Sequence, residues 1–132
     1  MIFVDTGGWY ASVVPADRDH EAAARWLATN DQPLVTTDYV IDETLTLLRM
    51  RNHQTRAVAL GAQFFAGHVA RIHYLNEEET IMTWEVFQRF ADKDWSFTDC
   101  SSKVVMERLG ITMAFAFDHH FRQFGSINVV PR

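Results

Sequence analysis

The sequence has a single cysteine, Cys100, among its 132 residues. One cysteine excludes an intrachain disulfide. Structural disulfides are typical of secreted proteins, and their absence here fits a reducing compartment. We therefore expect a cytoplasmic protein.

Long apolar runs are also missing, and this excludes two further classes of protein. No stretch approaches the roughly 20 apolar residues that a membrane-spanning helix needs. The N-terminus has no basic segment, and Asp5 interrupts its short apolar run, so we expect no secretory signal there. No membrane partner is expected.

Positive charge is scarce, because the 12 Lys and Arg residues are outnumbered by 17 Asp and Glu, for a formal net charge of −5. This balance argues against nucleic-acid binding by bulk electrostatics, but it allows an enzyme that acts on nucleic acid. The densest basic group is Arg49, Arg51 and Arg56, around one expected helix end. These residues are either solvated side chains favoured by the helix dipole or contacts to phosphate.

What the chain does contain is ample apolar material, with 48% hydrophobic and 13% aromatic residues, for one domain over residues 1–132. Short apolar runs alternate with segments of helical period. Strands are expected at residues 1–5, 34–36, 72–75, 112–117 and 127–130. Helices are expected at residues 9–14, 20–30, 37–50, 55–66, 76–91, 96–109 and 119–124. This alternation predicts an α/β protein with three layers, α/β/α, around a mostly parallel sheet of about five strands.

Two of the expected strands end on an acid. Asp5 follows the first apolar run, and Asp118 follows the run at residues 112–117. Open α/β sheets bind ligands outside the carboxyl ends of their strands, so both carboxylates are expected at a functional edge. Each acid is also explained as the N-cap of the helix that follows it.

Two further acids lie in expected helices. Glu43 falls at the margin of the apolar stripe of helix 37–50, where a carboxylate must be paired, hydrated or bound to metal. Asp42, its neighbour, points away from that stripe. Asp99 stands three residues after Ser96, which is the spacing of a capping box and would by itself explain both residues.

Together the four acids favour a metal site. Carboxylates a few ångströms apart cannot all stay ionised without a cation. Oxygen ligands in this number suit Mg²⁺ or Mn²⁺ rather than zinc, and the chain has no His/Cys cluster of zinc spacing. Such an ion is suited to phosphate ester chemistry, because it activates a water and neutralises charge that develops on the phosphate.

The chain resembles the PIN-domain ribonucleases and, within that family, the VapC-type toxins of toxin–antitoxin pairs. The matching segments follow the family's order over essentially the whole chain: IFVDTGGWYA at 2–11, DHEAA at 19–23, TTDYVIDETLTLL at 36–48, DWSFTDC at 94–100 and FAFDHHF at 115–121. The resemblance implies a PIN-like fold.

The resemblance also implies roles for individual residues. The acids that carry catalysis in the family fall on Asp5, Glu43, Asp99 and Asp118. Three of these are the implied metal ligands: Asp5, Asp99 and Asp118. Polar positions that support the acids or the attacking water fall on Thr6 and Ser96. The chain departs from the family at Ala116, where relatives often carry Thr.

The implied activity is that of a Mg²⁺- or Mn²⁺-dependent endoribonuclease that cuts structured RNA, either tRNA or ribosomal RNA. The implied partners are a second copy of the chain, in a homodimer, and a small VapB-type antitoxin that inserts into the active site. Candidate contacts to the RNA are Arg49, Arg51 and His119. His119 and His120 directly follow Asp118, so one of them can reach a phosphate, or both are exposed residues at a helix start.

Other families fit less well. Phosphatases of the haloacid dehalogenase class need a second Asp two residues after the first, where this chain has Gly7. A response-regulator receiver needs adjacent acids near the first strand and a late lysine, which the chain lacks. The non-enzymatic alternative is a PIN-like domain kept as an RNA- or protein-interaction module, and an intact set of four acids argues against it.

Overall fold

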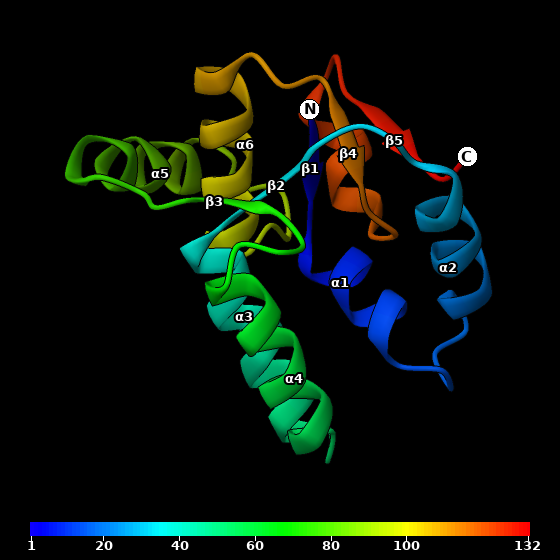
Figure 1. The fold of residues 1–132 in the computed structure, drawn as a ribbon. Coiled ribbons are helices and arrows are strands. Elements are labelled where there is room, and N and C mark those ends of the chain that lie inside the picture. Colours follow the sequence, from blue (N-terminus) through cyan, green and yellow to red (C-terminus); the bar gives the residue numbers. More distant parts are fainter.

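A sheet of five parallel strands runs through the middle of the molecule (Figure 1). The computed structural model describes all 132 residues. In spatial order the strands are β3 (Arg71–His73), β2 (Leu34–Thr37), β1 (Ile2–Val4), β4 (Met113–Phe115) and β5 (Asn128–Val130). Because all strands are parallel, they end at one edge of the sheet. β1 is central at that edge, between β2 and β4.

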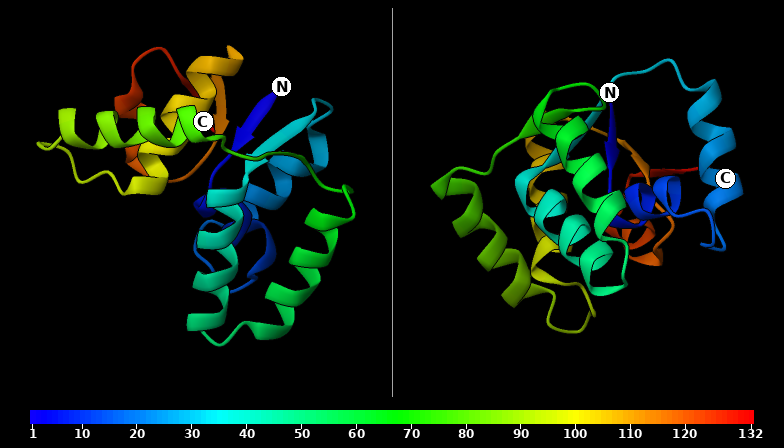
Figure 2. Two further views of the ribbon diagram at one scale, coloured as in Figure 1. Left: turned by 90° about the vertical axis from the view of Figure 1, so that its left-hand side faces the viewer. Right: turned by 60° about the horizontal axis from the view of Figure 1, so that its bottom comes forward.

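Helices follow the strands and flank the sheet (Figures 1 and 2). The first two pairs are α1 (Thr6–Val13) with α2 (His20–Thr29), and α3 (Asp38–Met50) with α4 (Gln54–Phe65). The later helices are α5 (Glu77–Arg89), α6 (Phe97–Leu109) and the 3-10 helix η1 (His119–Phe124). The α3–α4 pair extends beyond the carboxyl edge, and α5 lies to one side, against α6. None of these helices is both long enough and apolar enough to cross a membrane.

The central strands supply the most deeply buried side chains, among them Phe3, Val35 and Phe115, which are fully shielded from solvent. Trp26 of α2 stacks on Phe115 with ring centroids 4.5 Å apart, and Phe121 of η1 lies 6.0 Å from Phe3. Elements from both ends of the chain therefore pack on β1 and β4. This packing fixes the positions of the residues that follow those two strands.

Gly8 allows α1 to begin directly after β1. A Cβ atom at this position would lie 2.6 Å from Cδ1 of Phe115 and 2.7 Å from its carbonyl oxygen. Any larger residue would force α1 away from β4. The glycine therefore holds Asp5 and Thr6 close to the end of β4 and to the residues that follow it.

The structure confirms the expected α/β fold with a sheet flanked by helices, and the sheet is entirely rather than mostly parallel. The observed strand is shorter than the expected 112–117: β4 ends at Phe115, which pairs with Val130, and the next residue along β5 is Pro131, which has no N–H to donate. The expected strand at 72–75 ends at His73, because the N–H of Leu75 donates to Asp38 Oδ1 instead of continuing the ladder. The first helix starts at residue 6 rather than 9.

Candidate active site

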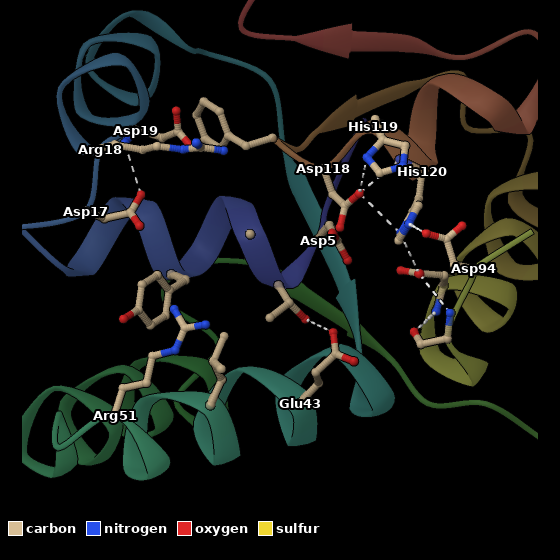
Figure 3. Close-up of a pocket in the computed structure, with 17 residues that line it drawn as sticks. Asp5, Asp17, Arg18, Asp19, Glu43, Arg51, Asp94, Asp118, His119 and His120 are labelled. Atoms are coloured by element: carbon tan, nitrogen blue, oxygen red, sulfur yellow. Dashed lines mark hydrogen bonds and ion pairs between the residues drawn. The ribbon is translucent and has the colours of Figure 1, made fainter.

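A cavity of about 950 Å³ opens at the carboxyl edge of the sheet, and we call it the acidic cavity (Figure 3). Only three of its 17 lining residues are hydrophobic. All four acids singled out in the sequence line it: Asp5, Glu43, Asp99 and Asp118. They come from the end of β1, from α3, from α6 and from the residues after β4, so the fold brings together positions that are far apart in the sequence.

Asp5 lies at the N-cap position of α1, but its side chain makes no capping hydrogen bond. The residue is 4% exposed, and its Oδ1 is buried without any hydrogen-bond partner. Burial, followed by the charge of Asp99, raises the pKa of Asp5 to about 8, and the charges of Glu43 and Asp118 act in the same direction. The backbone N–H of Thr6 opposes this increase only in part.

Glu43 is held by a hydroxyl from the neighbouring helix. Thr6 Oγ1 donates a hydrogen bond to Glu43 Oε1 at 2.6 Å. Glu43 is half-buried, whereas Asp42 is exposed, as the helical periodicity predicted. Thr6 therefore orients the acid, and Oε2 of Glu43 remains outside this hydrogen bond.

Asp99 belongs to a capping box and to the acidic cavity at the same time. Its N–H donates to Ser96 Oγ at 3.0 Å, and its Oδ2 accepts from the Ser96 N–H at 2.9 Å. Burial raises the pKa of Asp99, although the Ser96 N–H and the nearby His120 oppose the increase and Asp118 adds to it. The capping box thus fixes the carboxylate at the cavity instead of providing an alternative explanation for it.

Asp118 caps η1 and meets two histidines. Its Oδ1 accepts a hydrogen bond from the backbone N–H of His120 at 3.0 Å. The same oxygen lies 3.4 Å from the ring Nδ1 of His119 and 3.2 Å from the ring Nδ1 of His120. Nδ1 of His120 also lies 2.9 Å from Asp99 Oδ2, but its N–H is not aligned for a hydrogen bond with either acid. The side chain of His120 is 13% exposed, whereas that of His119 is 66% exposed. His120 is therefore the histidine that lies between Asp99 and Asp118. The sequence pointed to both histidines as residues that can reach a phosphate, and to His119 only as a candidate contact to RNA.

Of the two arginines proposed as RNA contacts, only one lines the acidic cavity. Arg51 lines the acidic cavity, and its guanidinium lies 5.1 Å from the centroid of the Tyr10 ring. Arg49 is not among the lining residues, and its Nε donates to Gln54 Oε1 at 2.8 Å, an exposed hydrogen bond between α3 and the start of α4. Arg18, which was not among the residues singled out in the sequence, lines the cavity from the turn after α1.

The donor set of the cavity fits a divalent metal ion. Oδ1 of Asp5 is a buried acceptor with no donor, and the pKa of Asp5 is raised by burial first and then by three more carboxylates. A hard cation would supply the missing partner and remove the repulsion between the acids. Asp5 and Asp118 lie side by side in the cavity (Figure 3), and Asp99 lines it with them. Thr6 is hydrogen-bonded to Glu43, and Ser96 is hydrogen-bonded to Asp99.

Comparison with known proteins agrees with this fold. The family model of the PIN domain matches residues 2–127. The chain therefore belongs to the PIN domain family. It is 35% identical over 131 residues, 99% of each chain, to the 23S rRNA-specific endonuclease VapC20 of Mycobacterium tuberculosis. A VapC ribonuclease of Archaeoglobus fulgidus is 34% identical over 89 residues, which is 67% of this chain and 55% of that relative.

Solved structures give the same result. The crystal structure of Mycobacterium tuberculosis VapC20, a sarcin–ricin loop cleaving toxin, has a TM-score of 0.92 and 34% identity, and the match covers 99% of this chain and 100% of that one. FitAcB from Neisseria gonorrhoeae has a TM-score of 0.71 at 12% identity, over 99% and 97% of the two chains, which shows a shared fold alone. The resemblance to VapC-type PIN proteins seen in the sequence is confirmed.

Proposed function

We propose that this protein is a Mg²⁺- or Mn²⁺-dependent endoribonuclease and the toxin of a type II toxin–antitoxin pair. The observation that carries the proposal is the unpartnered, buried Oδ1 of Asp5, placed among three other acids in an open cavity. The similarity to VapC20 over the full chain supports RNA as the substrate.

The residues of the acidic cavity have different roles in the proposed reaction. Asp5, Asp99 and Asp118 would hold the metal ion, which supplies an activated water and neutralises charge on the scissile phosphate. Glu43, whose Oε1 accepts a hydrogen bond from Thr6, would be the general base and would take a proton from that water through Oε2. Ser96 holds Asp99 in place through the capping box.

The RNA contacts we propose lie at the rim of the cavity. Arg51 is held over the ring of Tyr10 and presents a cation to a phosphate, a role for which the planar guanidinium is well suited. His119 is exposed beside Asp118 at the other end and can reach a neighbouring phosphate. Arg49 has no place in this proposal, because it does not line the cavity. The substrate is a structured RNA, either ribosomal RNA or tRNA.

The proposed partners are a second copy of the chain and a VapB-type antitoxin. For the dimer, α5 exposes large apolar side chains along one face, including Ile81, Trp84 and Phe87, and Trp84 stacks on Phe87 with centroids 6.1 Å apart. Sedimentation of the purified chain at micromolar concentration is expected to show a dimer. The RNA substrate and the single buried thiol of Cys100 support a cytoplasmic location.

Cleavage assays with matched variants test the proposed activity. Purified protein is incubated with ribosomal RNA and tRNA in Mn²⁺, in Mg²⁺ and in EDTA. We expect metal-dependent cleavage that falls at least about a thousandfold in Asp5→Asn, equivalent to roughly 4 kcal/mol of barrier. Asp42→Asn, one residue from Glu43 but exposed, is the control and should cleave at the wild-type rate.

The alternative of a non-catalytic interaction module makes a different prediction. In that case the RNA would stay uncleaved with or without metal, in wild type and in Asp5→Asn alike, although the protein would still bind it. Cleavage by Asp5→Asn at the wild-type rate would also refute the assignment, because it would show that the activity comes from elsewhere.

A further inference from the structure

A second group of metal-binding side chains lies at the rim of the acidic cavity, at the end opposite Arg51 (Figure 3). It consists of Asp94 from the loop before α6, and His119 and His120 from the start of η1. We propose that these three residues form a second cation site, one that takes a zinc-like divalent ion. The sequence showed no histidine cluster of zinc spacing, because Asp94 reaches the two histidines only through the fold.

The distances between the donors are close to those of a metal site. One ligand atom from each of the three residues lies within 4.8 Å of the others. Nε2 of His120 is 3.8 Å from Asp94 Oδ2, which is too far for a hydrogen bond. Bond lengths of about 2.1 Å separate two ligands of a tetrahedral zinc ion by roughly 3.4 Å, so small side-chain movements would close the site.

The orientation of His120 supports a role as a ligand. Its Nδ1 faces the carboxylates of Asp99 and Asp118 at 2.9 and 3.2 Å, which leaves Nε2 directed toward Asp94. Histidine ligands of metals commonly donate their other ring N–H to a carboxylate, which fixes the tautomer and the ring plane.

The donor set selects against the ion proposed for the four acids. Mg²⁺ favours oxygen ligands and keeps its waters, whereas imidazole nitrogen suits Zn²⁺, Ni²⁺ and Co²⁺. Asp94 and His119 are exposed, so the ion would be reached directly from solvent and would keep water in its remaining position. The two sites would therefore be filled by different metals. This inference does not depend on RNA cleavage.

Calorimetric titration of the tag-free protein with Zn²⁺, in excess Mg²⁺ to occupy the four acids, tests the proposal. We expect one Zn²⁺ per chain. His119→Ala and Asp94→Ala should each weaken binding at least about tenfold, the scale on which even outer-shell changes act. His68→Ala, an exposed histidine elsewhere, and Asp92→Ala, two residues from Asp94, are the matched controls. Circular dichroism checks that each variant is folded.

Several outcomes would overturn the proposal. Absence of Zn²⁺ binding would overturn it. Unchanged Zn²⁺ affinity in both His119→Ala and Asp94→Ala would also overturn it, and is the result expected if the imidazoles only neutralise the neighbouring acids. An equal loss of Zn²⁺ affinity in the controls, His68→Ala and Asp92→Ala, would indicate non-specific binding to the surface and would overturn the proposal. Asp5→Asn provides the last check, because it weakens the site of the four acids and should leave Zn²⁺ binding intact. Loss of Zn²⁺ binding in that variant would place the ion among the four acids.

Discussion

Two carboxylates are almost completely buried beyond the ends of strands, and their surroundings are opposite. Glu79, after β3, is 2% exposed, and Asp5, after β1, is 4% exposed. Glu79 accepts from the Asn76 N–H at 3.0 Å, contacts His73 at 3.0 Å and lies 3.8 Å from Arg108. Asp5 has an oxygen with no partner and three acids for neighbours.

The pKa values of the two acids differ accordingly. Burial alone would raise the pKa of Glu79, but the Asn76 N–H and the contacts with His73 and Arg108 outweigh it and lower the pKa. Burial raises the pKa of Asp5 to about 8, because nothing comparable opposes it. Burial of an acid is therefore no sign of function in itself. What distinguishes a candidate metal ligand is a buried acid that the protein leaves without partners.

The largest effect on stability is expected at Glu79. Glu79→Gln should lower the free energy of unfolding by about 3 kcal/mol at neutral pH, because it removes a buried charge that His73 and Arg108 require. The pKa of Glu79 is lowered on folding, so this stability is present above its unfolded pKa of about 4.3 and is lost as the pH falls through the folded value. Urea denaturation at neutral and at acid pH measures both the destabilisation by Glu79→Gln and the loss of the Glu79 contribution as the pH falls.

The control for this change is Glu78→Gln. Glu78 also pairs with Arg108, at 3.2 Å, but its side chain is 71% exposed. We expect a loss below about 0.5 kcal/mol. Glu79→Gln should retain metal-dependent RNA cleavage wherever it is folded, and loss of cleavage in a folded variant would contradict the structural role assigned to Glu79.

Metal should stabilise the protein through Asp5 and not through Glu79. Mn²⁺ at about a hundred times its dissociation constant should add roughly 2.7 kcal/mol to wild-type stability by binding linkage. Asp5→Asn should gain much less, and Glu78→Gln as much as wild type. Thermal melts with Mn²⁺ and with EDTA measure the difference. An equal gain in Asp5→Asn would exclude Asp5 as a ligand.

The pH dependence of the metal-free protein should depend on Asp5. Its folded pKa of about 8 exceeds the unfolded value, so the folded state keeps a proton that the unfolded chain releases. The stability present below the unfolded pKa, about 3.9, is therefore lost as the pH rises toward the folded value. In EDTA, wild type should lose about 2 kcal/mol relative to Asp5→Asn between about pH 5 and pH 7. Parallel stability curves for the two proteins would refute this.

The smallest effect is expected at Asp118, which is 42% exposed at its side chain. Asp118→Asn should be more stable than wild type in EDTA by less than about 1 kcal/mol, because water already screens much of the repulsion. Asparagine can still accept a hydrogen bond from the backbone N–H of His120, so the cap of η1 is kept and its loss does not contribute to the stability difference. Melts that run parallel to wild type both in EDTA and in Mn²⁺ would remove Asp118 from the metal site.

Much of the site could be predicted because local pattern and topology agree. The strands that precede Asp5 and Asp118 are apolar and short, and neighbouring parallel strands deliver the residues that follow them to one edge. The spacing of Ser96 and Asp99 predicted a capping box, and the structure contains it. The resemblance to the family then identified which acids belong together.

The residues that could not be predicted depend on contacts between distant segments. Asp94 meets His119 and His120 only because the loop before α6 passes beside η1. Glu79 looked like one of three acids in the first turn of a helix, and its burial requires His73 and Arg108 from other elements. Arg49 and Arg51 are two residues apart, but only Arg51, at the C-cap of α3, faces the cavity.

The capping box of α6 links the end of a helix to the lifetime of a bound metal. The Ser96 N–H donates to Asp99 Oδ2, so fraying of the first turn of α6 also releases one carboxylate of the cavity. Helix ends open far more often than the whole domain unfolds. The amide of Ser96 should therefore exchange with solvent more slowly when the cavity is filled, and its exchange rate reports metal occupancy without any cleavage assay.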